Sequence, residues 1–225
     1  MRAFALAGTR AAMRFVRSLK SRPFVTWRAP PAARTAKRPW PSPMGLENPA
    51  FETPARNTKY GLVNDGEGWF VVNAREARWR ERERLGVYCD FEGKRRFPQL
   101  GINVSVLQPG ESVGRYHREN GQEGFLILAG TCLLIVEDQE RELKAWDFFH
   151  SPPQTEHIIV GAGEGPSVVL AVGARGLGRT GLVYPVSKTA QKHGVSVKKE
   201  TTKPAEAYAN LPRPTRVSYE NGWLD

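Results

Sequence analysis

The sequence predicts an all-β fold, an antiparallel barrel or sandwich with an extension at each end. Eight short runs rich in Val, Ile, Leu and aromatic residues follow one another between residues 87 and 173. Turn-forming pairs such as Pro109-Gly110 and Asn120-Gly121 separate the runs, and no long helical pattern lies between them. Short strands with frequent turns are typical of antiparallel barrels and sandwiches. A length of 225 residues suits one such domain.

We expect four parts along the chain. They are a basic tail at 1–43, a lead-in at 44–84, the barrel at 85–173 and a C-terminal arm at 174–225. In the lead-in, GWFVV (68–72) predicts a first strand and AREARWRERERL (74–85) a short charged helix. Asn73 is the expected N-cap of that helix, Glu76 and Arg80 form an i,i+4 pair, and Gly86 stops it. One further short helix is expected at 205–209.

The barrel runs have the length and composition of strands. They are VYCDF (87–91), INVSVL (102–107), VGRYHRE (113–119), GFLILAG (124–130), TCLLIVED (131–138), ERELKAWDFF (140–149), HIIVGAG (157–163) and SVVLAVG (167–173). Several of them are apolar on both faces, so one face should be covered by another element or by a partner subunit. We therefore expect a homodimer.

The positive charge is confined to the tail. The chain has a formal net charge of +10, and residues 1–43 hold ten Lys and Arg with no acidic residue, which leaves the remainder balanced. A balanced body gives no reason to expect nucleic-acid binding. Three interpretations of the tail stay open: translation starts at Met44, the tail is an organellar transit peptide, or it is an arm for nucleic acid or a membrane surface.

The same observations bear on the compartment. After the tail, no stretch approaches the roughly 20 apolar residues that span a bilayer, so we expect no membrane partner. Cys89 and Cys132 lie in strand-like runs without zinc-site spacing, and we expect both to be buried small hydrophobes. Two such cysteines favour a reducing, cytoplasmic location, or an organellar one if the tail is a transit peptide.

Histidine and glutamate residues occur at characteristic intervals in two segments. The first places His117, Glu119, Glu123 and Gly130 at intervals of two, four and seven residues, and the second places His157 five residues after a proline. This spacing resembles the two motifs of the cupin superfamily, which implies a double-stranded β-helix, a jelly-roll-like antiparallel barrel. The resemblance covers both motifs and the 15 residues between them.

The sequence departs from the cupin pattern at four positions. Glu119 stands where the family usually has a second histidine, Trp146 and Gln154 replace two glycines, and Gly161 replaces a final asparagine. The resemblance therefore implies metal ligands at His117, Glu123 and His157, and at Glu119 by position only.

Strand geometry supports the same cluster. His117 and Glu119 are two residues apart and share one face of a strand. A plain two-residue hairpin at Asn120-Gly121 would turn Glu123 to the wrong face, so the metal interpretation requires an odd loop or a bulge that makes Glu119 and Glu123 opposite partners. Two imidazoles and two carboxylates suit one divalent Fe, Mn, Ni or Zn ion. The metal-free alternative is a polar cluster in which the histidines bond to the carboxylates.

Two functions from different classes follow. The first is a mononuclear metal-dependent enzyme of dioxygenase or isomerase type that acts on a small oxygen-containing molecule, with one carboxylate available as a base. The second is a non-catalytic cupin that binds a small, sugar-like ligand without metal. The other two histidines, His150 and His193, are not expected to be ligands.

Two further patterns imitate nucleotide-binding motifs. Gly176, Gly178 and Gly181 form G-x-G-x-x-G, and Tyr184 and Lys188 have the spacing of a dehydrogenase pair. A dinucleotide fingerprint must open a helix, but a proline follows within four residues and too little chain remains for a Rossmann sheet. We expect no nucleotide cofactor.

Overall fold

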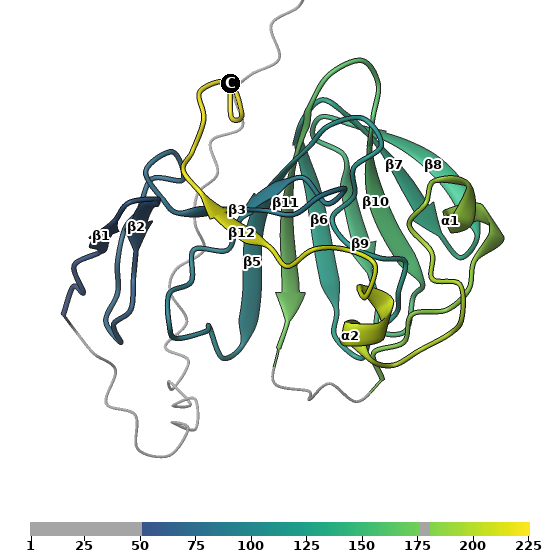
Figure 1. The fold of residues 1–225 in the computed structure, drawn as a ribbon, viewed down its shortest axis with the longest axis horizontal. Coiled ribbons are helices and arrows are strands. Elements are labelled where there is room, and N and C mark those ends of the chain that lie inside the picture. The colour runs from purple at the N-terminus through teal and green to yellow at the C-terminus, as the bar shows by residue number, and fades with distance from the viewer. Residues whose placement is uncertain (1–50, 176–180) are drawn as a thin grey trace, which may run out of the picture. The chain divides into compact units, whose positions relative to one another are not determined.

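Two antiparallel sheets face each other and enclose the core in the computed structural model, which describes residues 51–175 and 181–225 (Figure 1). Within these residues the larger sheet runs in the order β12 (Thr215–Val217), β3 (Trp79–Glu81), β4 (Val87–Cys89), β5 (Leu100–Leu107), β11 (Ser167–Ala174), β6 (Glu123–Ala129) and β9 (Phe148–Ser151). The smaller sheet runs β10 (His157–Ala162), β7 (Thr131–Val136) and β8 (Gln139–Lys144). The predicted all-β fold is confirmed.

Two short strands and two short helices complete the elements of the described residues. The strands β1 (Arg56–Thr58) and β2 (Gly61–Val63) form a hairpin, and the helices are α1 (Lys188–Lys192) and α2 (Pro204–Ala207). The arm helix predicted at 205–209 corresponds to α2, whereas α1 was not predicted. Ser187 caps α1, because its hydroxyl accepts a hydrogen bond from the backbone N–H of Ala190. No helix in the described part of the chain is long and apolar enough to cross a membrane.

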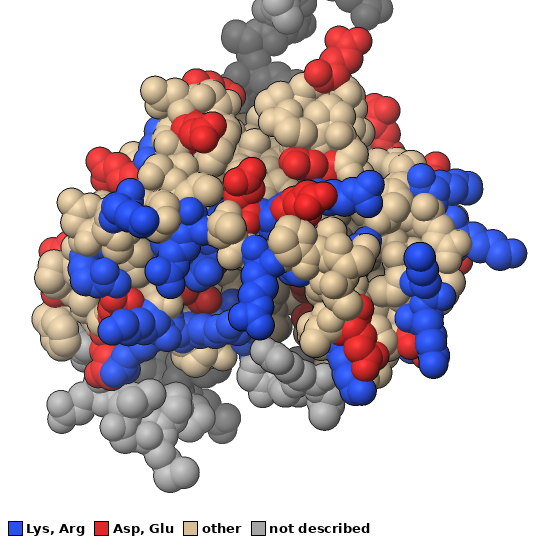
Figure 2. All heavy atoms as spheres, in the orientation of Figure 1, with Lys and Arg blue, Asp and Glu red and all other residues tan. Residues whose placement is uncertain are grey.

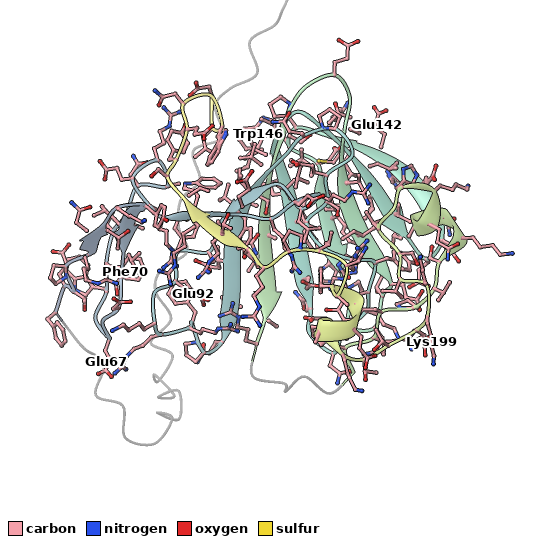
Figure 3. The ribbon with its side chains drawn as sticks, viewed as in Figure 1. Glu67, Phe70, Glu92, Glu142, Trp146 and Lys199 are labelled. Atoms are coloured by element: carbon pink, nitrogen blue, oxygen red, sulfur yellow. The ribbon has the colours of Figure 1, made fainter. Side chains whose placement is uncertain are left out.

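The main core lies between the two sheets. Inward-facing residues from both sheets form it: Leu107, Phe125, Ile127, Cys132, Leu134, Leu143, Ile159 and Val169. They alternate with outward-facing residues along each strand, as period-two patterning requires. Figure 3 draws the side chains of the described residues on the ribbon. This packing closes the barrel that carries the site described below.

A second cluster covers part of the outer face of the larger sheet. Trp79 is fully buried there against Tyr219 and Trp223 of the C-terminal arm. The arm thus supplies the covering element expected from strands that are apolar on both faces. Leu100 and Phe148 remain 46% and 64% exposed on the same sheet. The homodimer stays a prediction.

Both cysteines have the environment expected from the sequence. Cys89 and Cys132 are buried and free. Burial raises the pKa of each thiol to about 11. Both therefore pack as small apolar groups.

The helix predicted at 74–85 is wrong. Asn73 does begin a turn, since its side chain accepts from the Arg75 N–H, but the chain then extends into β3. Ala77 and Trp79, two residues apart, are both buried. Burying them against the larger sheet outweighs the weak i,i+4 pair on which the helix prediction relied.

Three strand predictions also need correction. The run 68–72 forms only an isolated bridge at Trp69, and 113–119 forms isolated bridges at His117 and Arg118 rather than a strand. The run 140–149 divides into β8 and β9 around a turn at Trp146, where φ is 75°. Two of the G-x-G-x-x-G glycines, Gly176 and Gly178, lie outside the described residues.

Candidate metal centre

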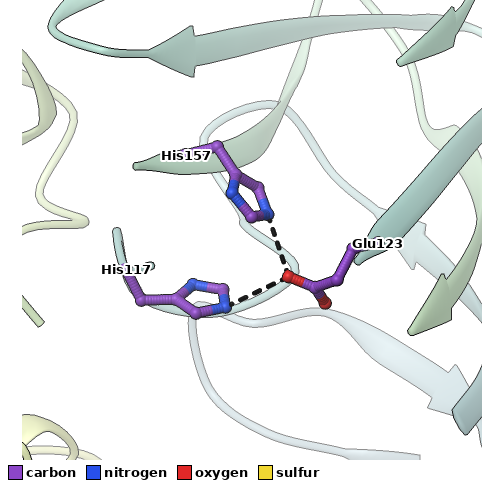
Figure 4. A group of neighbouring side chains, drawn as sticks. All are labelled: His117, Glu123 and His157. Atoms are coloured by element: carbon purple, nitrogen blue, oxygen red, sulfur yellow. Dashed lines mark ion pairs between the residues drawn. The ribbon is translucent and has the colours of Figure 1, made fainter. Parts of the chain in front are cut away.

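Three of the four predicted ligands converge inside the barrel. His157 is the first residue of β10, Glu123 is the first residue of β6, and His117 lies in the segment that precedes β6. Glu123 Oε2 is 3.2 Å from His157 Nε2 and 3.6 Å from His117 Nε2 (Figure 4). The ligand atoms of His117, Glu123 and His157 all lie within 4.8 Å of one another, so these three residues could hold one metal ion.

Backbone pairing brings the two histidines together. The His117 N–H donates to the His157 carbonyl at 3.2 Å, and the His157 N–H donates to the His117 carbonyl at 2.8 Å. The two rings are consequently 5.0 Å apart between centroids. The predicted pairing of Glu119 with Glu123 is not formed, because residues 117 and 118 bridge to His157 and Val183 while Glu123 pairs with Ser151. Convergence therefore comes from pairing between distant segments.

The outer nitrogens of both rings are fixed by the protein. His117 Nδ1 lies 2.8 Å from the Arg115 carbonyl oxygen, and His157 Nδ1 lies 3.0 Å from the Thr155 carbonyl oxygen. The Ser151 hydroxyl is 3.1 Å from the same nitrogen of His157. A carbonyl oxygen can only accept, so each Nδ1 carries the proton and each Nε2 faces Glu123. Histidine ligands of metals are oriented in this way.

Two atoms at the centre of the cluster lack hydrogen-bond partners. Glu123 Oε2 and His157 Nε2 are buried and unpartnered. A neutral imidazole with its proton on Nδ1 presents a lone pair at Nε2, and that lone pair points toward an anionic oxygen. Either an imidazolium proton or a cation must separate the two.

The distances suit a metal ion. Ligand atoms at about 2.0–2.2 Å from a metal, set at right angles, lie about 3 Å apart. The distances of 3.2 and 3.6 Å from Glu123 to the two nitrogens are close to that value. Two histidines and one carboxylate on adjacent positions also form the donor set of non-haem iron sites, with positions left open for other ligands.

The charges in the cluster depend on one another. Burial raises the pKa of Glu123, but the close approach and charge of His117 and His157 outweigh burial and lower the pKa to about 2. Burial lowers the pKa of His117, but the close approach and negative charge of Glu123 outweigh burial, and the net pKa is raised. Glu123 is thus held as an anion between two basic rings.

Glu119 lies beside the three converging residues and is not one of them. A Cβ built on Gly121 would lie 2.5 Å from Glu119 Oε1, so this carboxylate rests against the turn. Burial, followed by the negative charge of Glu123, raises the pKa of Glu119. Its role as a fourth ligand stays a prediction.

The other two histidines lie outside the cluster. His150 is exposed on β9. His193 Nε2 lies 2.9 Å from Glu140 Oε1 at the surface.

Backbone conformation explains the departures from the motif pattern. Trp146 and Gln154, which stand at the usual glycine positions, have φ of 75° and 67°, in the region that glycine favours. Gly130 has φ of 74°, and a Cβ there would lie 2.5 Å from the Pro166 carbonyl oxygen. A Cβ at Gly161 would likewise lie 2.5 Å from a backbone oxygen, so the family's asparagine has no room here. The turns of the motifs are retained even where their glycines are replaced.

The sequence analysis missed several residues around the site. Ser151 and the Thr155 carbonyl orient His157, and Phe125 and Phe149 stand edge-on to its ring at 5.3 and 5.6 Å. Tyr184, which the sequence offered only as half of a false dehydrogenase pair, is buried with its ring 6.0 Å from that of His117. Alternation along 123–125 and 149–151 could have indicated Phe125, Phe149 and Ser151, but no local pattern indicated Tyr184.

Comparison with known proteins identifies the fold family. Residues 103–173 match the cupin domain, so this part of the chain is a cupin domain. No curated protein matches the sequence.

Several solved structures match part of the chain. A protein described as a predicted oxalate decarboxylase from Thermotoga maritima is 21% identical, over 47% of this chain and 99% of that one, with a TM-score of 0.41. A sugar phosphate isomerase from Silicibacter pomeroyi is 24% identical, over 46% of this chain and 62% of that one, with a TM-score of 0.36. A cupin protein from Bacteroides fragilis is 20% identical, over 36% of this chain and 70% of that one, with a TM-score of 0.33. The chain spans less than two thirds of the length of the isomerase.

Proposed function

We propose that this cupin binds one divalent first-row metal, Fe, Mn, Ni or Zn, through His117, Glu123 and His157. We further propose that it is an enzyme of dioxygenase or isomerase type acting on a small oxygen-containing molecule. The supporting observation is the pair of buried, unpartnered atoms, Glu123 Oε2 and His157 Nε2, which face each other at 3.2 Å. A cation between them would satisfy both atoms at once.

The surrounding residues prepare the site for such an ion. The carbonyl oxygens of Arg115 and Thr155 hold the two rings with their Nε2 atoms inward, so the ligands need no reorganisation. Phe125 and Phe149 pack edge-on against the His157 ring, whose side chain is 2% exposed. When bound, the metal would supply Lewis acidity or a redox centre, with positions free for a substrate oxygen.

A specific observation also supports the metal-free alternative. The pKa of His117 is raised by Glu123 after opposing burial, so an imidazolium could satisfy the carboxylate without an ion. A non-catalytic cupin that binds a small, sugar-like ligand is the function consistent with that state.

A turnover assay separates the two functions. Full-length protein is stripped with chelator, resupplied separately with Fe, Mn, Ni or Zn, and tested for oxygen uptake and product formation with diketones, phenols and sugar phosphates. We expect turnover with at least one metal and its loss in Glu123→Gln. Substrate binding without turnover, unchanged by every metal, would contradict the enzyme proposal and favour the binding function.

A further inference from the structure

Basic side chains gather on one face of the molecule, away from the metal centre. Figure 2 shows this concentration of Lys and Arg over β3 and β12 and toward the β1–β2 hairpin. A cavity of about 460 Å³ lies there, lined by Arg56, Lys59, Arg78, Arg80, Lys94 and Arg216. Among the described residues that line the cavity, one is acidic, Asp65. A cavity of this size falls in the range of small-molecule sites.

Strand pairing places like charges opposite each other in the wall of this basic pocket. Arg216 of β12 and Arg80 of β3 are direct partners in the antiparallel register. Arg78 lies two residues before Arg80 and therefore on the same face of the chain. Like charges directly opposite in a sheet are destabilising unless an anion compensates them.

The nearby acids compensate only part of this charge. Asp65 pairs with Arg56 at 2.8 Å. Asp90 is shared, since its carboxylate is 3.2 Å from Arg80 Nε and 3.6 Å from the Arg78 guanidinium.

Three cations of the basic pocket remain. Lys59, Lys94 and Arg216 have no ion pair within the part of the chain that the structure describes. The Lys59 ammonium lies over the Tyr60 ring, 4.7 Å from its centroid, which leaves its charge uncompensated by any carboxylate.

Arg78 is the buried part of the pocket. It is 9% exposed and donates to the Glu92 carbonyl oxygen at 2.7 Å, but its Nε is buried without a hydrogen-bond partner. Figure 3 labels Glu92 between β2 and β5. Burial, followed by the charge of Arg80, lowers the pKa of Arg78. A buried guanidinium with an unused donor is poised for an oxyanion, which accepts in the plane of the donor fork.

Backbone hydrogen bonds and close packing hold the walls of the basic pocket in place. The backbone of Leu62 in β2 exchanges hydrogen bonds with Glu76 and Arg78, at 2.7 and 3.0 Å. Gly61 approaches Ala77 so closely that a Cβ would lie 2.6 Å from its carbonyl oxygen. The hairpin is thereby fixed against the residues that lead into β3.

We propose that the basic pocket binds a small anion bearing phosphoryl groups, at a site that goes beyond the proposed metal function. The balanced charge of residues 44–225 favours a small anion over a nucleic acid, because the surplus of charge is local to one cavity. Two phosphoryl groups engage more of the available donors than one, so a diphosphate binds more tightly than a monophosphate.

The test measures anion binding to the full chain at fixed ionic strength, by calorimetry with inorganic phosphate and with pyrophosphate. We expect saturable binding, stronger for pyrophosphate. The triple variant Lys59→Gln, Lys94→Gln, Arg216→Gln changes exposed side chains only and should weaken binding by at least about tenfold. A single Arg216→Lys substitution should lose less, because it keeps the charge.

A matched variant controls for net charge. Lys144→Gln, Lys188→Gln, Lys192→Gln removes the same charge from exposed residues outside the basic pocket and should leave binding unchanged. Equal losses in the two triple variants would overturn the proposal, as would binding no stronger than that of chloride. Tight binding of single-stranded RNA with phosphate and pyrophosphate inactive would also overturn it.

One variant separates the test of anion binding from the test of the metal proposal. Glu123→Gln should bind pyrophosphate normally, because Glu123 does not line the basic pocket. Loss of anion binding in this variant would contradict two independent sites.

Discussion

Two histidine–glutamate contacts of similar length occupy different settings in this molecule. Inside the barrel, His157 Nε2 is 3.2 Å from Glu123, and the two side chains are 2% and 18% exposed. At the surface, His193 Nε2 is 2.9 Å from Glu140, and the side chains are 31% and 41% exposed. Only the inner contact includes a second histidine and buried atoms without partners. A short histidine–carboxylate distance is therefore weak evidence for a metal site, whereas convergence of three donor side chains is stronger evidence.

The largest expected effect is on metal affinity when the inner carboxylate is changed. Glu123→Gln should lower affinity more than about 100-fold, because an amide is a neutral and weaker ligand. The side-chain amide can still donate to an imidazole, so the fold should persist. Calorimetric titration with Zn²⁺ and Mn²⁺ measures the change. His193→Ala is the matched control, and a comparable loss in that variant would remove the distinction between the two contacts.

Glu119 provides the next test, because it lies near the inner cluster without joining it. If it completes the ligand set, Glu119→Gln should weaken metal affinity less than Glu123→Gln does. Glu119→His, which restores the usual family residue, should retain metal and alter the preference among metals. Elemental analysis after exposure to mixed metals measures both. Unchanged content and preference in both variants would place Glu119 at the rim.

Ser151 tests whether orientation of the imidazole contributes. Its hydroxyl is 3.1 Å from His157 Nδ1, whereas the partner of the His193 ring among the described residues is the Glu140 carboxylate. Ser151→Ala should lower metal affinity by about tenfold while leaving the ligands in place. Ser151→Thr keeps the hydroxyl and should retain most of the affinity. A loss equal to that of Glu123→Gln would instead indicate that the substitution disturbs the barrel.

The smallest expected effect is that of a substitution at Trp146, which should change the stability of the barrel without changing its affinity for metal. Trp146 is 74% exposed with φ of 75°, in the turn that leads into β9. Trp146→Gly should stabilise the fold by about 1 kcal/mol, because glycine adopts this backbone without strain. Metal affinity should not change. Urea unfolding measures the first quantity, and destabilisation would show that the exposed indole contributes packing.

Periodicity predicted the parts of the barrel that pack on themselves. The runs that became β6, β7, β10 and β11 alternate or are continuously apolar over six to eight residues, and each pairs along its length with a neighbour. In such runs the local sequence pattern agrees with the tertiary pairing, so the pattern alone was enough to predict these strands.

Prediction failed where distant residues decide the structure. The segment with the predicted helix became β3 because Trp79 packs against residues near 219 and 223, far along the chain. His117 meets His157 through a bridge between distant segments, whereas the parity argument considered only a local hairpin that would make Glu119 and Glu123 opposite partners. The candidate ligands followed from motif spacing. The carbonyls of Arg115 and Thr155 that orient the two rings did not, because the direction of a backbone carbonyl leaves no pattern in the sequence.

The most direct test of the account is the metal stoichiometry of the full-length chain. Protein stripped of metal and titrated calorimetrically with Zn²⁺, Mn²⁺, Ni²⁺ or anaerobic Fe²⁺ should bind one ion per chain, with release of protons if His117 is protonated in the free protein. Protein purified without chelator should carry a corresponding metal by elemental analysis. If the purified chain carries no metal and binds none of these ions on titration, the claim that His117, Glu123 and His157 form a metal centre is wrong.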